Sequence, residues 1–232
     1  MLSVNIEEIM TDFGSEPRIF QSEAQFQFEM AWELQKQCQR KNAKVLLEMV
    51  TATELQEKRK RYYSDIVIRN CEGEYIVIEL KYKTKKSTYG DIELLHHGAN
   101  DLGRFDYLWD LHRIQLLKNH DNGRYRFNSS LQRFVAGYAI MLTNDERYWT
   151  VSRRSLQNQR PLYYDFCIGN GDEIPSGTVL KWKDRENCVR GTCRDCSLTF
   201  EKSYRMEWRD YYFSNDLDSK FDLDFKYLIL NV

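Results

Sequence analysis

Several features of common protein classes are absent from this chain. Only 3 of its 232 residues are proline and 11 are glycine, and no linker or low-complexity tract marks a domain boundary. No apolar run approaches the roughly 18 residues of a membrane span, since the longest, such as 134–142, are strand-sized. Four carboxylates lie in residues 1–16, where a secretory signal needs a basic start and an apolar core. We therefore expect one domain over residues 1–232, in the cytoplasm and without membrane contact.

The whole chain has 6 cysteines, which is too few for a disulfide framework in a protein of this size. The cluster Cys188-x4-Cys193-x2-Cys196 offers three thiols, whereas tetrahedral zinc needs four ligands. Cys167 or a distant histidine would have to complete the set, so the sequence leaves a zinc site open.

Motifs for nucleotide-powered or serine-nucleophile chemistry are missing, since the chain contains no GxGxxG, GxxxxGK[ST], GxSxG or HExxH. The formal net charge is −1, but residues 56–86 hold nine basic and five acidic side chains, a net of +4. A local positive block of this kind suits one anionic ligand better than nonspecific polyanion binding.

Hydrophobic periodicity predicts a mixed α/β order of elements. Ser22 and Gln25 match a capping box, in which the Gln25 side chain would return to the Ser22 amide, and helical spacing continues to about Gln39. The rest of the chain alternates between strand and helix patterns. We expect strands at 44–50, 64–69 and 75–81, the last two as a hairpin, then a helix from 91 to about 117, a buried strand at 134–142 and short peripheral strands in 151–232.

Two carboxylates and a lysine fall on one face of the predicted hairpin. Because side chains alternate along a strand, Glu79 and Lys81 share a face, and pairing in a suitable register brings Asp65 beside them. Adjacent carboxylates repel each other unless a hard divalent cation takes both as ligands, and Mg²⁺ suits that role. The Leu80 carbonyl could supply a further oxygen, and the Lys81 ammonium could contact a metal-bound water or a phosphate.

The stretch from Ser22 to Lys83 resembles the core of the PD-(D/E)XK nuclease superfamily. The resemblance rests on Ser64-Asp65, an apolar strand, a turn and the strand Ile76-Val77-Ile78-Glu79-Leu80-Lys81, preceded by a helix that carries Glu23. Ser64 stands where the motif has its proline. The resemblance implies a restriction-endonuclease-like central mixed β-sheet flanked by helices. It places the motif core at about 22–145 and a β-rich elaboration at about 146–232.

The same resemblance implies a metal-dependent nuclease that hydrolyses phosphodiester bonds in defence, repair or mobile-element biology. DNA is favoured over RNA as the nucleic-acid partner. The sequence does not decide whether the protein forms a homodimer. Asp65 and Glu79 would bind Mg²⁺, with Mn²⁺ as substitute, and Lys81 would position or activate the attacking water. Glu23 would assist the metal directly or through water.

Basic residues around the motif are candidates for phosphate contacts. In this superfamily a helix after the lysine strand often lends a polar or basic residue to the site, although an ordinary ion pair three residues apart is an equal alternative there. The candidates are Arg61, Lys83, Lys85, Lys86 and Arg104, with Asp101 as a second-tier candidate.

Other classes of function stay open alongside the nuclease. Glu79 and Lys81 could form a solvated ion pair of little energetic value, and the adjacent His96 and His97 are more often neither metal ligands nor a general base. A catalytically silent nucleic-acid-binding or protein-interaction module on the same fold is the main alternative. A third is an interaction protein whose Tyr- and Trp-rich C-terminal part binds another protein.

Overall fold

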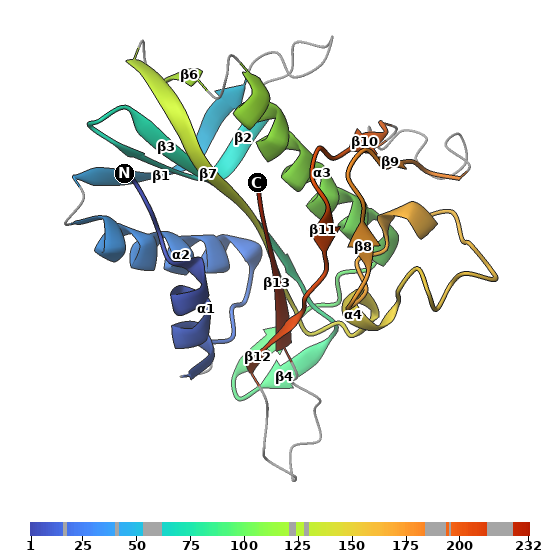
Figure 1. The fold of residues 1–232 in the computed structure, drawn as a ribbon. Coiled ribbons are helices and arrows are strands. Elements are labelled where there is room, and N and C mark those ends of the chain that lie inside the picture. The colour runs from blue at the N-terminus through green and yellow to red at the C-terminus, as the bar shows by residue number, and fades with distance from the viewer. Residues whose placement is uncertain are drawn as a thin grey trace.

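A mixed β-sheet runs through the molecule and carries helices on both faces (Figure 1). The computed structural model describes residues 1–15, 18–39, 42–52, 62–120, 124–127, 130–183, 194, 196–212 and 225–232. Within these residues seven strands form the central sheet, all antiparallel to their neighbours except for the parallel pair β3–β7. In sheet order they are β1 (Ala43–Ala52), β2 (Tyr62–Asn70), β3 (Glu74–Lys83), β7 (Ser130–Thr143), β13 (Phe225–Asn231) and β12 (Arg209–Tyr212), with β6 (Arg124–Phe127) also paired to β7.

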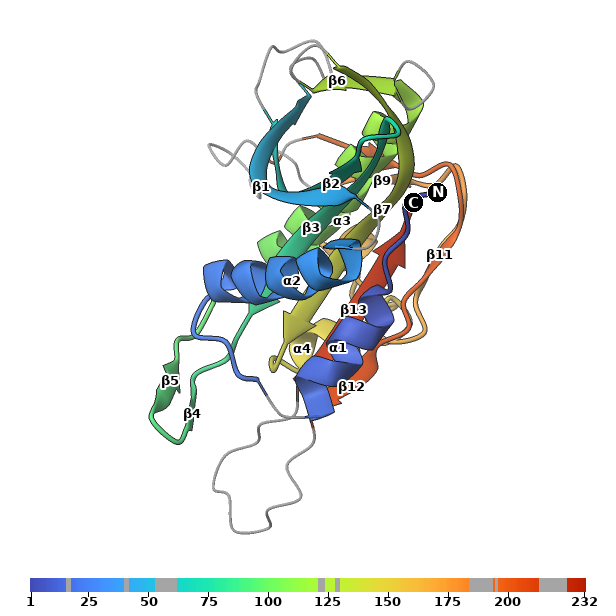
Figure 2. The ribbon, with the colours of Figure 1, turned by 90° about the vertical axis from the view of Figure 1, so that its left-hand side faces the viewer.

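Strand alternation divides the core between the two faces of this sheet. On one face Ile66, Ile76 and Ile78 pack with apolar residues of α1 (Ile6–Ser15) and α2 (Glu23–Cys38). On the other face Val67 and Val77 pack with α3 (Asn100–Asn119) and with the segments that follow β7. Figure 2 shows α1 and α2 on the side of the sheet away from α3. The mixed α/β class predicted from the sequence is therefore confirmed.

The predicted helix start at Ser22 is confirmed, with one change in its capping. The Ser22 hydroxyl accepts a hydrogen bond from the Gln25 amide at 3.1 Å, and α2 then runs to Cys38. The Gln25 side chain accepts from the Gln21 amide at 2.8 Å, one residue earlier than predicted. The predicted strands at 44–50, 64–69, 75–81 and 134–142 lie within β1, β2, β3 and β7.

The prediction of a helix from residue 91 was wrong for residues 91–99, because α3 begins at Asn100. Residues 87–94 form a hairpin of β4 (Ser87–Tyr89) and β5 (Ile92–Leu94), and Gly90 adopts a φ of 54° in its turn. Ala99, with a φ of 57°, directly precedes the first residue of α3. The strand β5 and the left-handed backbone at Ala99 exclude a continuous helix from residue 91.

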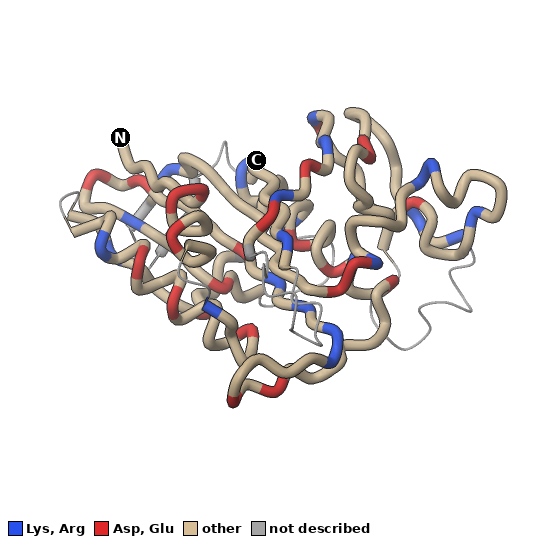
Figure 3. Tube along the Cα trace, turned by 90° about the horizontal axis from the view of Figure 1, so that it is seen from below, with Lys and Arg blue, Asp and Glu red and all other residues tan. Residues whose placement is uncertain are grey.

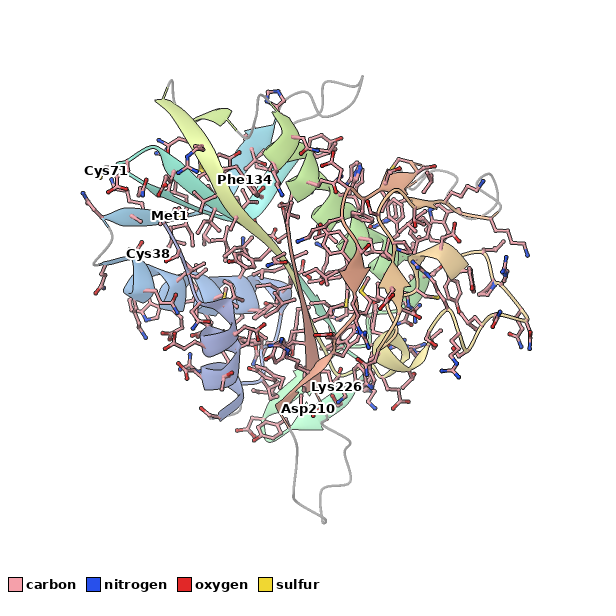
Figure 4. All side chains as sticks on the ribbon, in the orientation of Figure 1. Met1, Cys38, Cys71, Phe134, Asp210 and Lys226 are labelled. Carbon is pink, nitrogen blue, oxygen red and sulfur yellow. The ribbon has the colours of Figure 1, made fainter. Side chains whose placement is uncertain are left out.

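The C-terminal part of the chain contributes more to the sheet than the sequence indicated. Two strand pairs are short and peripheral, as predicted: β8 (Glu173–Ile174) with β11 (Tyr204–Arg205), and β9 (Val179–Leu180) with β10 (Leu198–Thr199). However, β13 lies between β7 and β12 in the central sheet, so no structural break separates residues before 145 from those after it. The ion pair between Lys226 and Asp210 joins β13 to β12 (Figure 4).

Two short helical segments, α4 (Arg147–Thr150) and the 3₁₀ helix η3 (Tyr164–Phe166), lie between β7 and β8. Together with β8–β11 they cover the α3 face of the sheet. No helix in the described part of the chain is long and apolar enough to cross a membrane.

Gly14 sets how closely α1 approaches β12, and its replacement tests this packing. A Cβ at Gly14 would lie 2.1 Å from the Tyr211 carbonyl oxygen. We expect Gly14→Ala to lower the free energy of unfolding by about 1–3 kcal/mol, because two backbones must separate. Gly98→Ala is the matched control, since a Cβ there meets no atom within 4 Å. Equal urea midpoints for the two variants and the wild type would contradict this packing.

Candidate functional site

The two strands of the predicted hairpin separate at Asp65. Their backbone register runs from Arg69↔Tyr75 to Ile66↔Ile78. Beyond it the start of β2 stays paired with β1, whereas the end of β3 stays paired with β7. Figure 2 shows β1 curving away from the line of β3 and β7. The central sheet therefore opens between the beginning of β2 and the end of β3.

Carboxylates take the place of a strand partner along this open edge. The Asp65 carboxylate accepts a hydrogen bond from the Leu80 amide at 2.7 Å. The Glu23 carboxylate, from the first turn of α2, accepts from the Tyr82 amide at 2.7 Å. Buried backbone N–H groups need acceptors, so β3 holds both carboxylates at the opening.

A histidine continues the same edge. The Nδ1 atom of His97 accepts from the Thr84 amide at 3.1 Å, and the His97 amide donates to the Thr84 carbonyl at 2.8 Å. Nδ1 is therefore unprotonated in this arrangement, and the imidazole is held as an edge cap. This contact joins residues across the β4–β5 hairpin, and the sequence alone gave no signal for it.

Buried charges from α3 meet the motif residues on the opposite side of the opening. Glu79 forms an ion pair with Arg113, and Lys81 forms one with Asp110. Arg113 also lies 3.3 Å from Asp110. The side chains of Glu79 and Asp110 are 3% and 6% exposed, and those of Arg113 and Lys81 are 13% and 16% exposed. The Lys81 ammonium also donates to the Leu80 carbonyl at 3.1 Å.

The prediction that Asp65, Glu79 and Lys81 share one face of a hairpin is confirmed by this geometry. On α3, the residues that contact Glu79 and Lys81 are Arg113 and Asp110, which the sequence analysis did not name. Their i,i+3 spacing on a largely apolar helix was the available signal.

Arg104 has a structural role that the sequence did not indicate. Its guanidinium is buried, donates to the Arg147 carbonyl at 2.6 Å and lies over the rings of Tyr148 and Tyr163 at 5.3 and 5.2 Å. It therefore links α3 to α4 and the segment beyond, and it has no surface for the predicted phosphate contact. Asp101, the second-tier candidate, lies half-buried in the first turn of α3.

Of the lysines after the motif, Lys83 is the last residue of β3, and Lys85 and Lys86 lie between β3 and β4. Lys83 is half-buried, Lys85 lies 3.8 Å from Glu146, and the exposed Lys86 lies 4.0 Å from Glu93. Of the three lysines, Lys86 is the one whose exposed side chain an anion can reach. Three residues singled out in the sequence lie outside the described residues: Arg61, Cys188 and Cys193.

Burial shapes the ionisation of the site. It raises the pKa of Asp65 to about 6, against the smaller opposing effects of Lys81 and of the Leu80 amide. Burial also raises the pKa of Glu79, although the Arg113 guanidinium opposes the shift. For Lys81, burial alone would lower the pKa, but the carboxylates of Asp110, Glu23 and Asp65 hold it above its usual value.

The donor chemistry of the opening fits a hard divalent cation. Asp65 and Glu79 are each next to the last backbone pair, Ile66↔Ile78, so both lie where the two strands begin to separate. The carboxylates of Glu23 and Asp110 lie beside the same cations, Lys81 and Arg113. Four carboxylates and two cations together carry a formal charge of −2. Oxygen ligands and a residual charge of this sign suit Mg²⁺ or Mn²⁺.

The carboxylates are not arranged as a finished metal shell. Within the part of the chain that the structure describes, no group of three or more His, Cys, Asp or Glu side chains is placed to hold a metal ion. The ion pairs explain this, because Glu79 and Asp110 point their oxygens at Arg113 and Lys81. Metal binding therefore requires Glu79 to exchange a partner.

Comparison with known proteins adds no relative. No family model matches the chain, no curated protein matches it, and no solved structure matches it. The residues and the geometry of the opening are therefore the basis for proposing a function.

The raised pKa of Asp65 predicts a stability change in Asp65→Asn. Because the folded-state pKa of about 6 exceeds the ordinary value of 3.8, the native state binds more protons between these values. The wild type should therefore lose stability as pH rises from about 4 to about 6. Asparagine keeps an acceptor for the Leu80 amide, so we expect a gain of about 1–3 kcal/mol at neutral pH that disappears near pH 4.

Urea denaturation across this pH range checks the prediction. Asp91→Asn, at an exposed position in the β4–β5 turn, is the control and should match the wild type throughout. A difference between Asp65→Asn and the wild type that does not vary with pH would be inconsistent with a raised Asp65 pKa.

Proposed function

We propose that this chain is a metal-dependent nuclease of the PD-(D/E)XK type that hydrolyses phosphodiester bonds, with DNA favoured over RNA. One observation carries the proposal. The sheet opens where Asp65, Glu79 and Lys81 lie on one face, and Glu23 completes the edge of the opening. Two carboxylates at the opening, beside a lysine, are the groups that phosphodiester hydrolysis needs for a cation and for the negative charge of the reacting phosphate.

Each motif residue has a distinct role in this proposal. Asp65 and Glu79 would hold the divalent cation, Mg²⁺ or its substitute Mn²⁺. The chemistry supplied by a cation bound there is polarisation of the phosphate and activation of water. Lys81 stabilises the negative charge that develops on the phosphate, and Asp110 orients its ammonium together with the Leu80 carbonyl. Glu23 fixes the end of β3 at the opening through the Tyr82 amide.

Lys83, Lys85 and Lys86 extend the site towards the substrate. Lys83 ends the motif strand and Lys85 and Lys86 come directly after it, so we expect phosphates of a bound strand to pass along these rim lysines. Figure 3 shows that basic side chains also occur elsewhere on the molecule, so these lysines are one of several basic groups. Binding through these lysines should depend on salt.

A cleavage assay with supercoiled, linear and single-stranded DNA and with RNA tests the catalytic roles. We expect cutting in Mg²⁺ or Mn²⁺ and none in EDTA. Lys81→Met and Glu79→Gln should each lose at least about 100-fold in rate, because each removes a charge that acts on the reacting phosphate. Lys36→Met, at an exposed lysine on α2, is the matched control and should cut like the wild type. Cutting that survives Lys81→Met would rule out this site.

Salt dependence of DNA binding tests the role of the rim lysines. In EDTA, where cleavage is blocked, we expect the triple variant of Lys83, Lys85 and Lys86 to alanine to bind more weakly. The slope of log affinity against log salt should fall by about 1 for each lysine that contacts a phosphate. Fluorescence anisotropy over a salt series measures both quantities, and an unchanged slope would place the DNA elsewhere.

One observation favours a catalytically silent binding module as the second candidate. Glu79 and Lys81 are already neutralised by Arg113 and Asp110, as in a structural charge network. Such a module would bind nucleic acid without cleaving it and would not bind Mn²⁺.

The third hypothesis was an interaction protein that binds a partner through C-terminal aromatic residues. Three of these residues are buried in the structure. Trp182, Trp208 and Tyr204 are between 4% and 8% exposed and pack in the core on the α3 face. These side chains stabilise the fold and are not displayed for a partner.

A further inference from the structure

Arg113 occupies the position in the opening where positive charge is needed. Its guanidinium forms an ion pair with the almost fully buried Glu79 and lies 3.3 Å from Asp110. Arginine suits such a place because its fork can contact two carboxylates at once and its charge is not lost on burial. A divalent cation that takes Glu79 as a ligand needs the same carboxylate oxygens.

Arg113 also has partners that do not involve Glu79. It donates to the Tyr63 carbonyl at 2.9 Å, and its guanidinium lies 5.6 Å from the ring centre of Tyr62. Both partners belong to the start of β2, at the mouth of the opening. Release from Glu79 would therefore leave the guanidinium anchored on the carbonyl, the ring and Asp110.

We propose that Arg113 is a built-in counterion that competes with the divalent cation for Glu79, so that α3 sets the metal affinity of the site. This inference rests on the proposed function. In the metal-free protein Arg113 compensates the buried charge of Glu79 and preserves the fold. Metal binding exchanges that contact, and the affinity is lower than the four carboxylates alone would give.

Calorimetric titration of the full chain with Mn²⁺ tests the proposal without an activity readout. We expect Arg113→Met to bind Mn²⁺ about tenfold more tightly than the wild type or better, because one opposite charge changes the proton affinity of a carboxylate by about 1–3 log units. Mn²⁺ should also raise the Tm of Arg113→Met more than that of the wild type, since the cation replaces the missing counterion. Arg113→Lys keeps the charge without the fork, and it should bind with intermediate affinity if Arg113→Met is too unstable to purify.

Arg133→Met is the matched control. Arg133 pairs with a buried carboxylate, Glu74, at the opposite end of β3, so its removal should leave Mn²⁺ affinity unchanged. Addition of Glu79→Gln to Arg113→Met should abolish the gain, because the competition takes place at Glu79.

The outcomes separate this inference from the function on which it rests. Mn²⁺ binding by the wild type with equal or weaker binding by the Arg113 variants would overturn the counterion role and leave the nuclease proposal standing. A gain that persists in the double variant with Glu79→Gln would overturn it as well. Absence of Mn²⁺ binding from the wild type and from every Arg113 variant would reject the metal site itself.

Discussion

The structure depends on the place where β2 and β3 stop pairing. A sheet that loses a strand partner leaves backbone N–H groups that must find other acceptors. Here the carboxylates of Asp65 and Glu23 accept from the amides of Leu80 and Tyr82, and they are thereby held at an opening in an otherwise continuous sheet. Paired strands would leave no room for these carboxylates between them, but separated strands hold them through backbone amides. The same hydrogen bonds therefore stabilise the fold and position the acidic groups of the candidate site.

Burial of several charged groups at this opening is unfavourable, and ion pairs from α3 offset that free-energy cost. Burial disfavours ionised carboxylates, as the raised pKa values of Asp65 and Glu79 show. Asp110 and Arg113 supply opposite charges to Lys81 and Glu79, so the network is satisfied before any ligand arrives. The same ion pairs make the site a poor ready-made metal shell. Under the proposed function, stability of the protein without the cation and affinity for the cation therefore oppose each other, as is common where function requires buried charge.

Local patterns allowed the motif to be predicted, but long-range packing did not follow from them. Alternation along two neighbouring strands was enough to place Asp65, Glu79 and Lys81 on one face, because that relation needs only a hairpin and its register. The partners Asp110 and Arg113 depend on which face of α3 meets β3, and the pattern of this helix indicated Arg104 equally well. The position of β13 beside β7 joins segments more than eighty residues apart, and a short apolar run does not specify its neighbours.

Anomalous diffraction from crystals soaked in Mn²⁺ would show whether a cation enters the opening and displaces Arg113 from Glu79. We expect an anomalous peak between the carboxylates of Asp65 and Glu79, with the Arg113 guanidinium moved from Glu79 to the Tyr63 carbonyl and Asp110. A structure without a peak in the opening, with Arg113 still paired to Glu79 at saturating Mn²⁺, would rule out the metal site and identify the charge network as purely structural.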